Sequence, residues 1–237
     1  MRTVIMTTGV PGVGKSTFMA LLEAKLRGDG ILAALINDYR FYSEWKDLEG
    51  NQIFWEPLGE TFNLKPEAYE HVSVYAAGRL ADEVADFFDE GKRVVVVEAA
   101  RGAFGRDNYT EGLFVPIAQG LDGREDPICF ANFEVVAPSK EVIVARARDR
   151  IGEDPNAAPP ETCLKYFDGD ELFCSSVLEL RRSPLGVTPI MNETVDNGGT
   201  IEGVKAVVEG LYPTMLERLG IGGSVEGGRP LDGKERL

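Results

Sequence analysis

Residues 7–18 read TTGVPGVGKSTF, and GVPGVGKS at 9–16 has the G-x-x-x-x-G-K-S spacing of a phosphate-binding loop. Glycines let consecutive main-chain N–H groups turn inward around an anion, and a helix that begins directly afterwards adds the partial positive charge of its N-terminus. Lys15 can reach the β and γ phosphates of a nucleotide, and the hydroxyl of Ser16 can bind Mg²⁺. The predicted chemistry is the binding of a nucleoside triphosphate.

The alternative is a glycine turn that joins a strand to a helix by chance. At average residue usage, on the order of one chain in a hundred of this length would contain the G-x-x-x-x-G-K-S motif by chance. This rarity favours a phosphate-binding loop over a chance glycine turn. A loop of this kind occurs in kinases, GTPases, transport ATPases and ligases alike, so other segments must indicate the reaction. The expected nucleotide-binding residues are Gly9, Pro11, Gly12, Val13, Gly14, Lys15, Ser16, Thr17, Arg146 and Arg150.

A strand, a helix and a second strand are needed to position this loop. Residues 2–8 form a short segment of mainly apolar and β-branched side chains, which predicts a buried strand. Residues 15–27 carry apolar side chains at helical spacing and end at Gly28. Residues 31–37 predict the second strand, and a β-α-β unit of this size predicts a parallel sheet.

Further strands are predicted at 93–99, 128–137 and 186–194, and further helices at 66–90 and 139–150. Strands that alternate with helices indicate an α/β fold. We expect a three-layer α/β/α architecture of the P-loop NTPase type, with a mainly five-stranded parallel sheet between the helices.

The expected domain organisation is one domain over 1–219 and a flexible tail over 220–237, which has little to bury. A helical acceptor-binding segment is expected at about 39–90. Residues 151–170 are rich in proline and acid, so we expect a long lid loop there.

Charged residues follow two of the predicted strands, where ligands bind in a doubly wound sheet. Asp38 and Arg40 follow the second strand, and Glu98 and Arg101 follow the third. An acid there can hold Mg²⁺ through water or accept the proton of an attacking hydroxyl, and an arginine can clamp a phosphate or carboxylate. Asp38 could instead be a turn residue. The four valines before Glu98 predict a buried strand, in which a carboxylate without a binding partner would cost free energy.

These positions give the expected catalytic group, Lys15, Asp38, Glu98 and Arg101, and leave open whether Asp38 or Glu98 is the base. Ser16 and Glu98 are the expected Mg²⁺ ligands, the latter directly or through water.

Arg146 and Arg150 are four residues apart, so they share one helix face and lead into the lid segment. They could stack on a nucleobase and grip phosphoryl oxygens. The alternative is a solvated helix C-terminus, where the helix dipole favours cations.

The composition narrows the ligand class. The chain has a net charge of −14 and a pI near 4.6, so its electrostatic field repels the phosphates of nucleic acid. This charge favours a small molecule as the acceptor. Because His71 is the only histidine, His-based zinc sites and Ser-His triads are disfavoured. Three cysteines without metal-type spacing fit a cytoplasmic protein, and no apolar run reaches the length of a membrane span. Nothing in the sequence indicates an oligomeric state.

Over roughly residues 1–217 the chain resembles the P-loop kinases of the nucleoside monophosphate kinase-like superfamily. The resemblance lies in VIMTTGVPGVGKST, in FEVVAPSKEVIVARARDR and in NETVDNGGTIEGVKAVVEGL. It implies that Arg146 and Arg150 are lid arginines and that the last segment holds a strand, a loop beside the adenine and a closing helix.

Two shorter segments are similar to different branches of these kinases. NDYRFY resembles the second-strand end of uridine-kinase-like enzymes, in which the Asp is the base, and this implies Asp38. Glu98-x-x-Arg101 is similar to the Glu-Arg or Asp-Arg pairs of deoxynucleoside and thymidylate kinases, although those pairs are adjacent.

The expected function is Mg²⁺-dependent transfer of the γ phosphoryl group of ATP to a small acceptor. The resemblance implies that nucleosides and nucleotides are the leading candidates for the acceptor. A nucleotide-dependent switch and an ATP-dependent ligase remain alternatives, although neither an Asn-Lys-x-Asp nor a strand-terminal Asp-x-x-Gly motif of a switch appears. ATP is not distinguished from GTP by these patterns.

Overall fold

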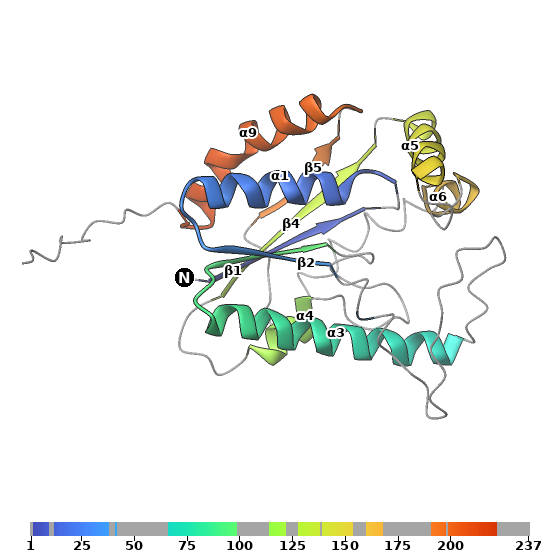
Figure 1. Ribbon diagram of the computed structural model, residues 1–237. Coiled ribbons are helices and arrows are strands. Elements are labelled where there is room, and N and C mark those ends of the chain that lie inside the picture. Colours follow the sequence, from blue (N-terminus) through green and yellow to red (C-terminus); the bar gives the residue numbers. More distant parts are fainter. Residues whose placement is uncertain are drawn as a thin grey trace, which may run out of the picture.

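Helices cover both faces of a five-stranded parallel sheet in the computed structural model (Figure 1). The structure describes residues 2–9, 12–37, 41, 66–98, 114–121, 128–137, 139–153, 160–167, 191–197 and 199–221. The α/β class and the three-layer arrangement predicted from the sequence are confirmed.

The sheet has the order β2-β3-β1-β4-β5, and all its strand pairs are parallel. The strands are β1 (Arg2–Thr8), β2 (Ala33–Asn37), β3 (Val94–Glu98), β4 (Ile128–Val136) and β5 (Met191–Asp196). Thr7 pairs with Glu98, and Glu98 pairs with Asn37 on its other side. The carboxyl ends of β1, β2 and β3 are therefore level at one edge of the sheet.

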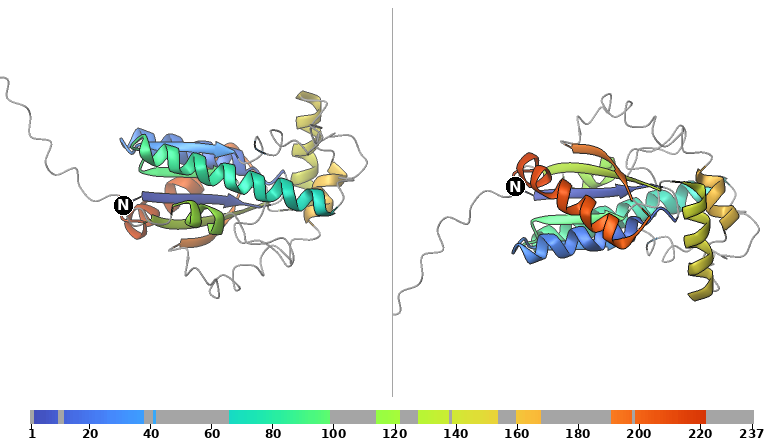
Figure 2. Two further views of the ribbon diagram at one scale, coloured as in Figure 1. Left: turned by 90° about the horizontal axis from the view of Figure 1, so that it is seen from below. Right: turned by 90° about the horizontal axis from the view of Figure 1, so that it is seen from above.

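The helices divide between the two faces and one end of the sheet. They are α1 (Lys15–Gly28), α3 (Pro66–Asp89), α4 (Phe114–Gly120), α5 (Lys140–Glu153), α6 (Pro160–Phe167) and α9 (Ile201–Arg218). α1 and α9 lie over one face and α3 and α4 over the other (Figure 1). α5 and α6 stand at the end where β1 leads into α1 (Figure 2).

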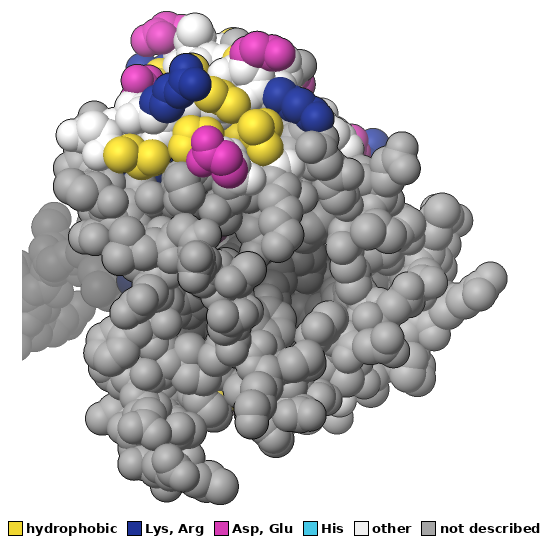
Figure 3. Space-filling view, turned by 90° about the vertical axis from the view of Figure 1, so that its right-hand side faces the viewer, with side chains coloured by type: hydrophobic (Ala, Val, Ile, Leu, Met, Phe, Trp, Pro, Cys, Tyr) yellow, Lys and Arg dark blue, Asp and Glu magenta, His cyan; other side chains and the backbone are white. Residues whose placement is uncertain are grey.

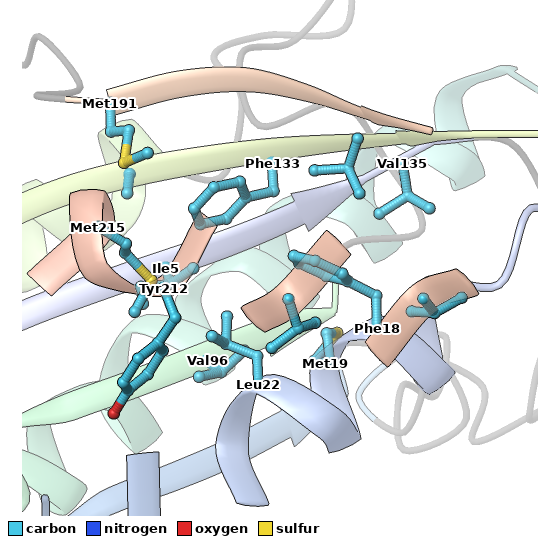
Figure 4. Close-up of a cluster of buried hydrophobic side chains, with 14 of the residues drawn as sticks. Ile5, Phe18, Met19, Leu22, Val96, Phe133, Val135, Met191, Tyr212 and Met215 are labelled. Carbon is cyan, nitrogen blue, oxygen red and sulfur yellow. The ribbon is translucent and has the colours of Figure 1, made fainter. Parts of the chain in front are cut away.

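Apolar side chains bury each face separately. On the side of α1 and α9, Phe18 and Phe133 pack with ring centroids 5.6 Å apart, and Leu22 and Met215 lie in the same cluster (Figure 4). On the other side, Leu80 and other apolar side chains of α3 meet the opposite faces of the strands. Valines of β3 alternate between the two clusters, which explains why this strand is apolar at successive positions.

The expectation of a loop across 151–170 is wrong in part. Residues 151–153 complete α5, and Pro160–Phe167 form α6. Proline suits the first position of a helix, because its missing N–H would have no partner there, and Glu161 complements the helix dipole in the first turn. Residues 154–159 and 168–170 lie outside the described residues.

Other boundaries differ by small amounts. α4 was not predicted, and β5 runs over Met191–Asp196 rather than 186–194. β2 begins at Ala33 instead of residue 31. Within the parts of the chain that the structure describes, no helix is both long and apolar enough to cross a bilayer. The tail expected over 220–237 starts too early, because Ile221 is buried in the cluster on the side of α1 and α9. Residues 222–237 lie outside the described residues.

Phe133→Ala tests the contribution of the aromatic contact to this core. Phe133 is 1% exposed, so its removal leaves a cavity, and we expect the free energy of unfolding to fall by about 3–5 kcal/mol in urea denaturation. Leu32→Ala is the control, because Leu32 is 57% exposed and its loss should change stability by less than about 0.5 kcal/mol. Equal losses for the two variants would contradict the assignment.

Candidate functional site

The glycine-rich loop connects the central strand β1 to α1. Gly9, Gly12 and Gly14 have φ angles of +135°, +87° and +93°, a region that side chains with a Cβ rarely adopt. Gly14 is also the N-cap of α1 and gives the helix no side-chain cap. The loop therefore uses glycine for its backbone shape at the point where the helix dipole is positive.

Lys15 is folded over the loop that precedes it. Its side chain is buried, with 8% exposed, and Nζ donates a hydrogen bond of 2.8 Å to the carbonyl oxygen of Gly9. A buried ammonium is costly unless it is paired, so this position suits a group that also binds an anion. The structure therefore places the ammonium group of Lys15 beside the main chain of the glycine-rich loop.

Ser16 and Glu98 meet across the carboxyl edge of the sheet. The Ser16 hydroxyl donates to Oε1 of Glu98 at 2.8 Å, and the Asn37 amide donates to Oε2 at 3.1 Å. Asn37 reaches Glu98 because β2 and β3 pair in register at their last residues. The carboxylate is thus held by residues from two other segments, with one oxygen directed at the loop.

Hard oxygen donors of this kind suit Mg²⁺, which uses one or two carboxylates together with substrate phosphates. The Ser16 hydroxyl and the Glu98 carboxylate supply such oxygens next to the loop. No group of three or more His, Cys, Asp or Glu side chains gathers as a metal site among the described residues. A magnesium site built from one hydroxyl, one carboxylate and nucleotide phosphates does not require such a group.

Arg146 and Asn197 contact the loop from its other side. Arg146 Nη1 donates to the carbonyl oxygens of Val13 at 2.9 Å and Gly12 at 3.4 Å, and Nη2 donates to Oδ1 of Asn197 at 3.0 Å. The Asn197 amide also donates to the Val13 carbonyl. Burial, followed by the charge of Arg150, lowers the pKa of Arg146 from its usual value.

A pocket of about 210 Å³ opens beside these contacts. It is lined by Gly12, Gly14, Thr17, Arg146, Arg150, Asn197, Gly199, Thr200, Ile201 and Val204. The lining therefore combines loop backbone, two arginines and the start of α9. Figure 3 faces the end of the molecule that carries α5 and α6, where lysine and arginine side chains lie among hydrophobic and acidic ones.

α5 and α6 pack directly against the loop. A Cβ on Gly12 would meet Ile143 of α5 at 3.2 Å and the sulfur of Cys163 of α6 at 3.8 Å. Burial raises the pKa of the Cys163 thiol, and the charges of Arg150 and Lys15 partly offset that rise. Any movement of this helix pair must therefore change contacts of the loop itself.

The structure brings some of the predicted site residues together and does not describe others. Lys15, Ser16 and Glu98 converge at the carboxyl edge of the sheet, and Arg146 and Arg150 line one pocket. Four of the predicted residues lie outside the described residues: Pro11, Asp38, Arg40 and Arg101. The roles assigned to all of these residues stay predictions.

Asn37 and Asn197 are site residues that the sequence analysis missed. Asn37 is the last residue of β2 and directly precedes Asp38. Asn197 directly follows β5, within the segment NETVDNGGTIEGVKAVVEGL. The one signal in the sequence was for Asn37, which is the last residue of its predicted strand, whereas the last strand was predicted to end at 194, three residues before Asn197.

Comparisons with known proteins give a structural likeness. No protein-family model matches the chain, and no curated protein matches it. A solved structure with a similar fold is that of an unliganded sugar kinase from Janibacter sp., with a TM-score of 0.50 and 18% sequence identity. The match covers 94% of this chain and 96% of that one. The chain therefore has a fold similar to that of this solved protein.

Gly14→Ala tests the backbone requirement at the loop. The φ of +93° is strained for alanine, and the new methyl group would collide with the Asn197 amide. We expect at least about 1–2 kcal/mol of lost unfolding free energy, measured by urea denaturation. Gly210→Ala in α9 is the matched control, because nothing lies within 4 Å and alanine should stabilise the helix by about 0.5–1 kcal/mol. Effects of the same sign would contradict the geometry.

Proposed function

We propose that the protein is an ATP-dependent phosphotransferase that moves the γ phosphoryl group to a small-molecule acceptor. The observation that carries the proposal is the 2.8 Å hydrogen bond between Ser16 of the glycine loop and Glu98 at the end of β3. It joins a phosphate-binding motif to an acid at the sheet edge where ligands bind in folds of this class. The likeness to the fold of a sugar kinase, which covers 94% of this chain, supports the same class of reaction.

Binding of the triphosphate falls to the loop and to Lys15. Main-chain N–H groups at the start of α1 would bind the triphosphate together with the helix dipole. Lys15 adds a full charge within hydrogen-bond reach of the loop. Mg²⁺ held by the Ser16 hydroxyl and the Glu98 carboxylate would neutralise phosphate charge.

The acceptor is activated and oriented by residues at the strand ends. In this proposal Glu98 orients an attacking hydroxyl or accepts its proton. The hydrogen bond from Asn37 to the second carboxylate oxygen supports that role, because it fixes the carboxylate. Asp38 directly follows Asn37 in the sequence and is the other candidate for this base. Arg101 would bind a phosphate or carboxylate of the acceptor.

The acceptor class rests on two different supports. The sequence resemblance favours nucleosides and nucleotides, and the fold neighbour is a sugar kinase. Nucleosides, nucleotides and sugars are all small molecules with hydroxyl groups. A small acceptor agrees with the acidic composition of the chain, which repels polynucleotides. A nucleotide-dependent switch or an ATP-dependent ligase would use the same loop for a different outcome.

Incubation of the protein with γ-labelled ATP, Mg²⁺ and separate pools of nucleosides, nucleotides and sugars tests the proposal. Label on a small molecule from one pool supports phosphotransfer and identifies the acceptor class. Release of label only as inorganic phosphate in every pool would favour a switch, and acceptor-dependent release of phosphate with a newly joined product would favour a ligase.

Glu98→Gln should lower the rate of phosphoryl transfer by about 10²–10⁴-fold, because glutamine cannot accept a proton. Binding of Mg·ATP, measured by calorimetry, should fall much less. Glu90→Gln is the control: it makes the same change on an exposed residue before β3, at the opposite end of that strand. A Glu98→Gln variant with unaltered turnover would exclude Glu98 as the base and leave Asp38.

A further inference from the structure

The contacts of Arg146 and Asn197 lie on the carbonyl side of the glycine loop. Both side chains donate to the Val13 carbonyl oxygen, and Arg146 also donates to that of Gly12. We propose that Arg146 and Asn197 are positioning residues, which hold the loop in the orientation that binds polyphosphate. This inference rests on the proposed function, since it concerns the same ligand.

The reason lies in the geometry of the peptide bond. In a planar trans peptide, the C=O of one residue and the N–H of the next point in opposite directions. Holding the carbonyls of Gly12 and Val13 toward Arg146 and Asn197 therefore directs the N–H groups of Val13 and Gly14 away from them. The two side chains fix the direction of donors that they do not touch.

Asn197 is built into this position. It is 2% exposed, and its own main-chain N–H donates to the Val136 carbonyl at 3.0 Å, directly beyond β5. A Cβ on Gly14 would occupy the space of the Asn197 amide, so glycine at position 14 is what allows this side chain to reach the loop. The side-chain amide of Asn197 bonds a loop carbonyl and an arginine, and its main-chain N–H bonds a strand end, so this buried residue has little freedom to move.

The arrangement ties three distant segments to the loop. Arg146 comes from α5, Asn197 follows β5, and α6 packs on Gly12 through Cys163. Arg146 was expected to contact the nucleotide itself, and its hydrogen bonds to loop carbonyls give it a second role, in ordering the backbone. A lysine at this position would keep the charge but lacks the planar set of donors that spans two carbonyls and an amide.

The experiment measures binding of Mg·ATP and of Mg·tripolyphosphate, which occupies the loop without a nucleoside, by calorimetry to Asn197→Ala. We expect both affinities to fall by about tenfold, which is about 1.4 kcal/mol. The substitution adds no charge, so repulsion of phosphate does not explain a loss.

Asn192→Ala is the matched control. It removes a side-chain amide whose oxygen accepts a hydrogen bond of 2.9 Å from Asn132. Asn132 is buried, with 2% exposed. Asn192 lies five residues before Asn197, about 16 Å along an extended strand. Thermal unfolding should show destabilisation of both variants, whereas only Asn197→Ala should lose affinity for tripolyphosphate.

Arg146→Lys is the second variant and does not depend on Asn197→Ala folding. It should also bind Mg·tripolyphosphate more weakly than the wild type. Wild-type affinity for tripolyphosphate in a folded Asn197→Ala or Arg146→Lys protein would overturn the inference, as would a loss confined to Mg·ATP. Failure of the wild-type protein to bind either ligand would instead overturn the proposed function.

Discussion

The direction of a few peptide units between β1 and α1 is the constraint on which the rest of the site depends. A peptide chain carries one donor and one acceptor per unit on opposite sides, so a loop that offers several N–H groups to an anion must place its carbonyls elsewhere. Here the carbonyls of Gly9, Gly12 and Val13 are met by Lys15, Arg146 and Asn197. The cationic groups of the site thus also satisfy the backbone.

The sheet topology explains why these groups can meet. β1 lies at the centre of the order β2-β3-β1-β4-β5, so its carboxyl end has neighbours on both sides. β3 delivers Glu98 from one side, and the segment after β5 delivers Asn197 from the other. The two apolar clusters hold the strands in this register, which makes core packing a condition for the alignment of the polar edge.

Sequence patterns predicted the frame better than the contacts. β1 to β4 are mainly apolar or β-branched runs and the glycine motif has fixed spacing, so these features were recognisable without a structure. β5 is mostly polar, and its predicted bounds were displaced. α6 was missed because proline and acid within 151–170 suggested a loop, although proline at position 160 begins the helix. The pairing of Ser16 with Glu98 was expected as a shared metal site, whereas Asn37 and Asn197 were missed because a single amide forms no pattern.

Sequence separation within the site has a consequence for synthesis of the chain. The partners of the hydrogen bonds are 82 residues apart for Ser16 and Glu98, and 184 residues apart for Asn197 and Val13. A ribosome therefore releases the glycine motif long before it releases the asparagine that contacts it. Nascent chains shorter than about 197 residues lack that contact whatever else has folded.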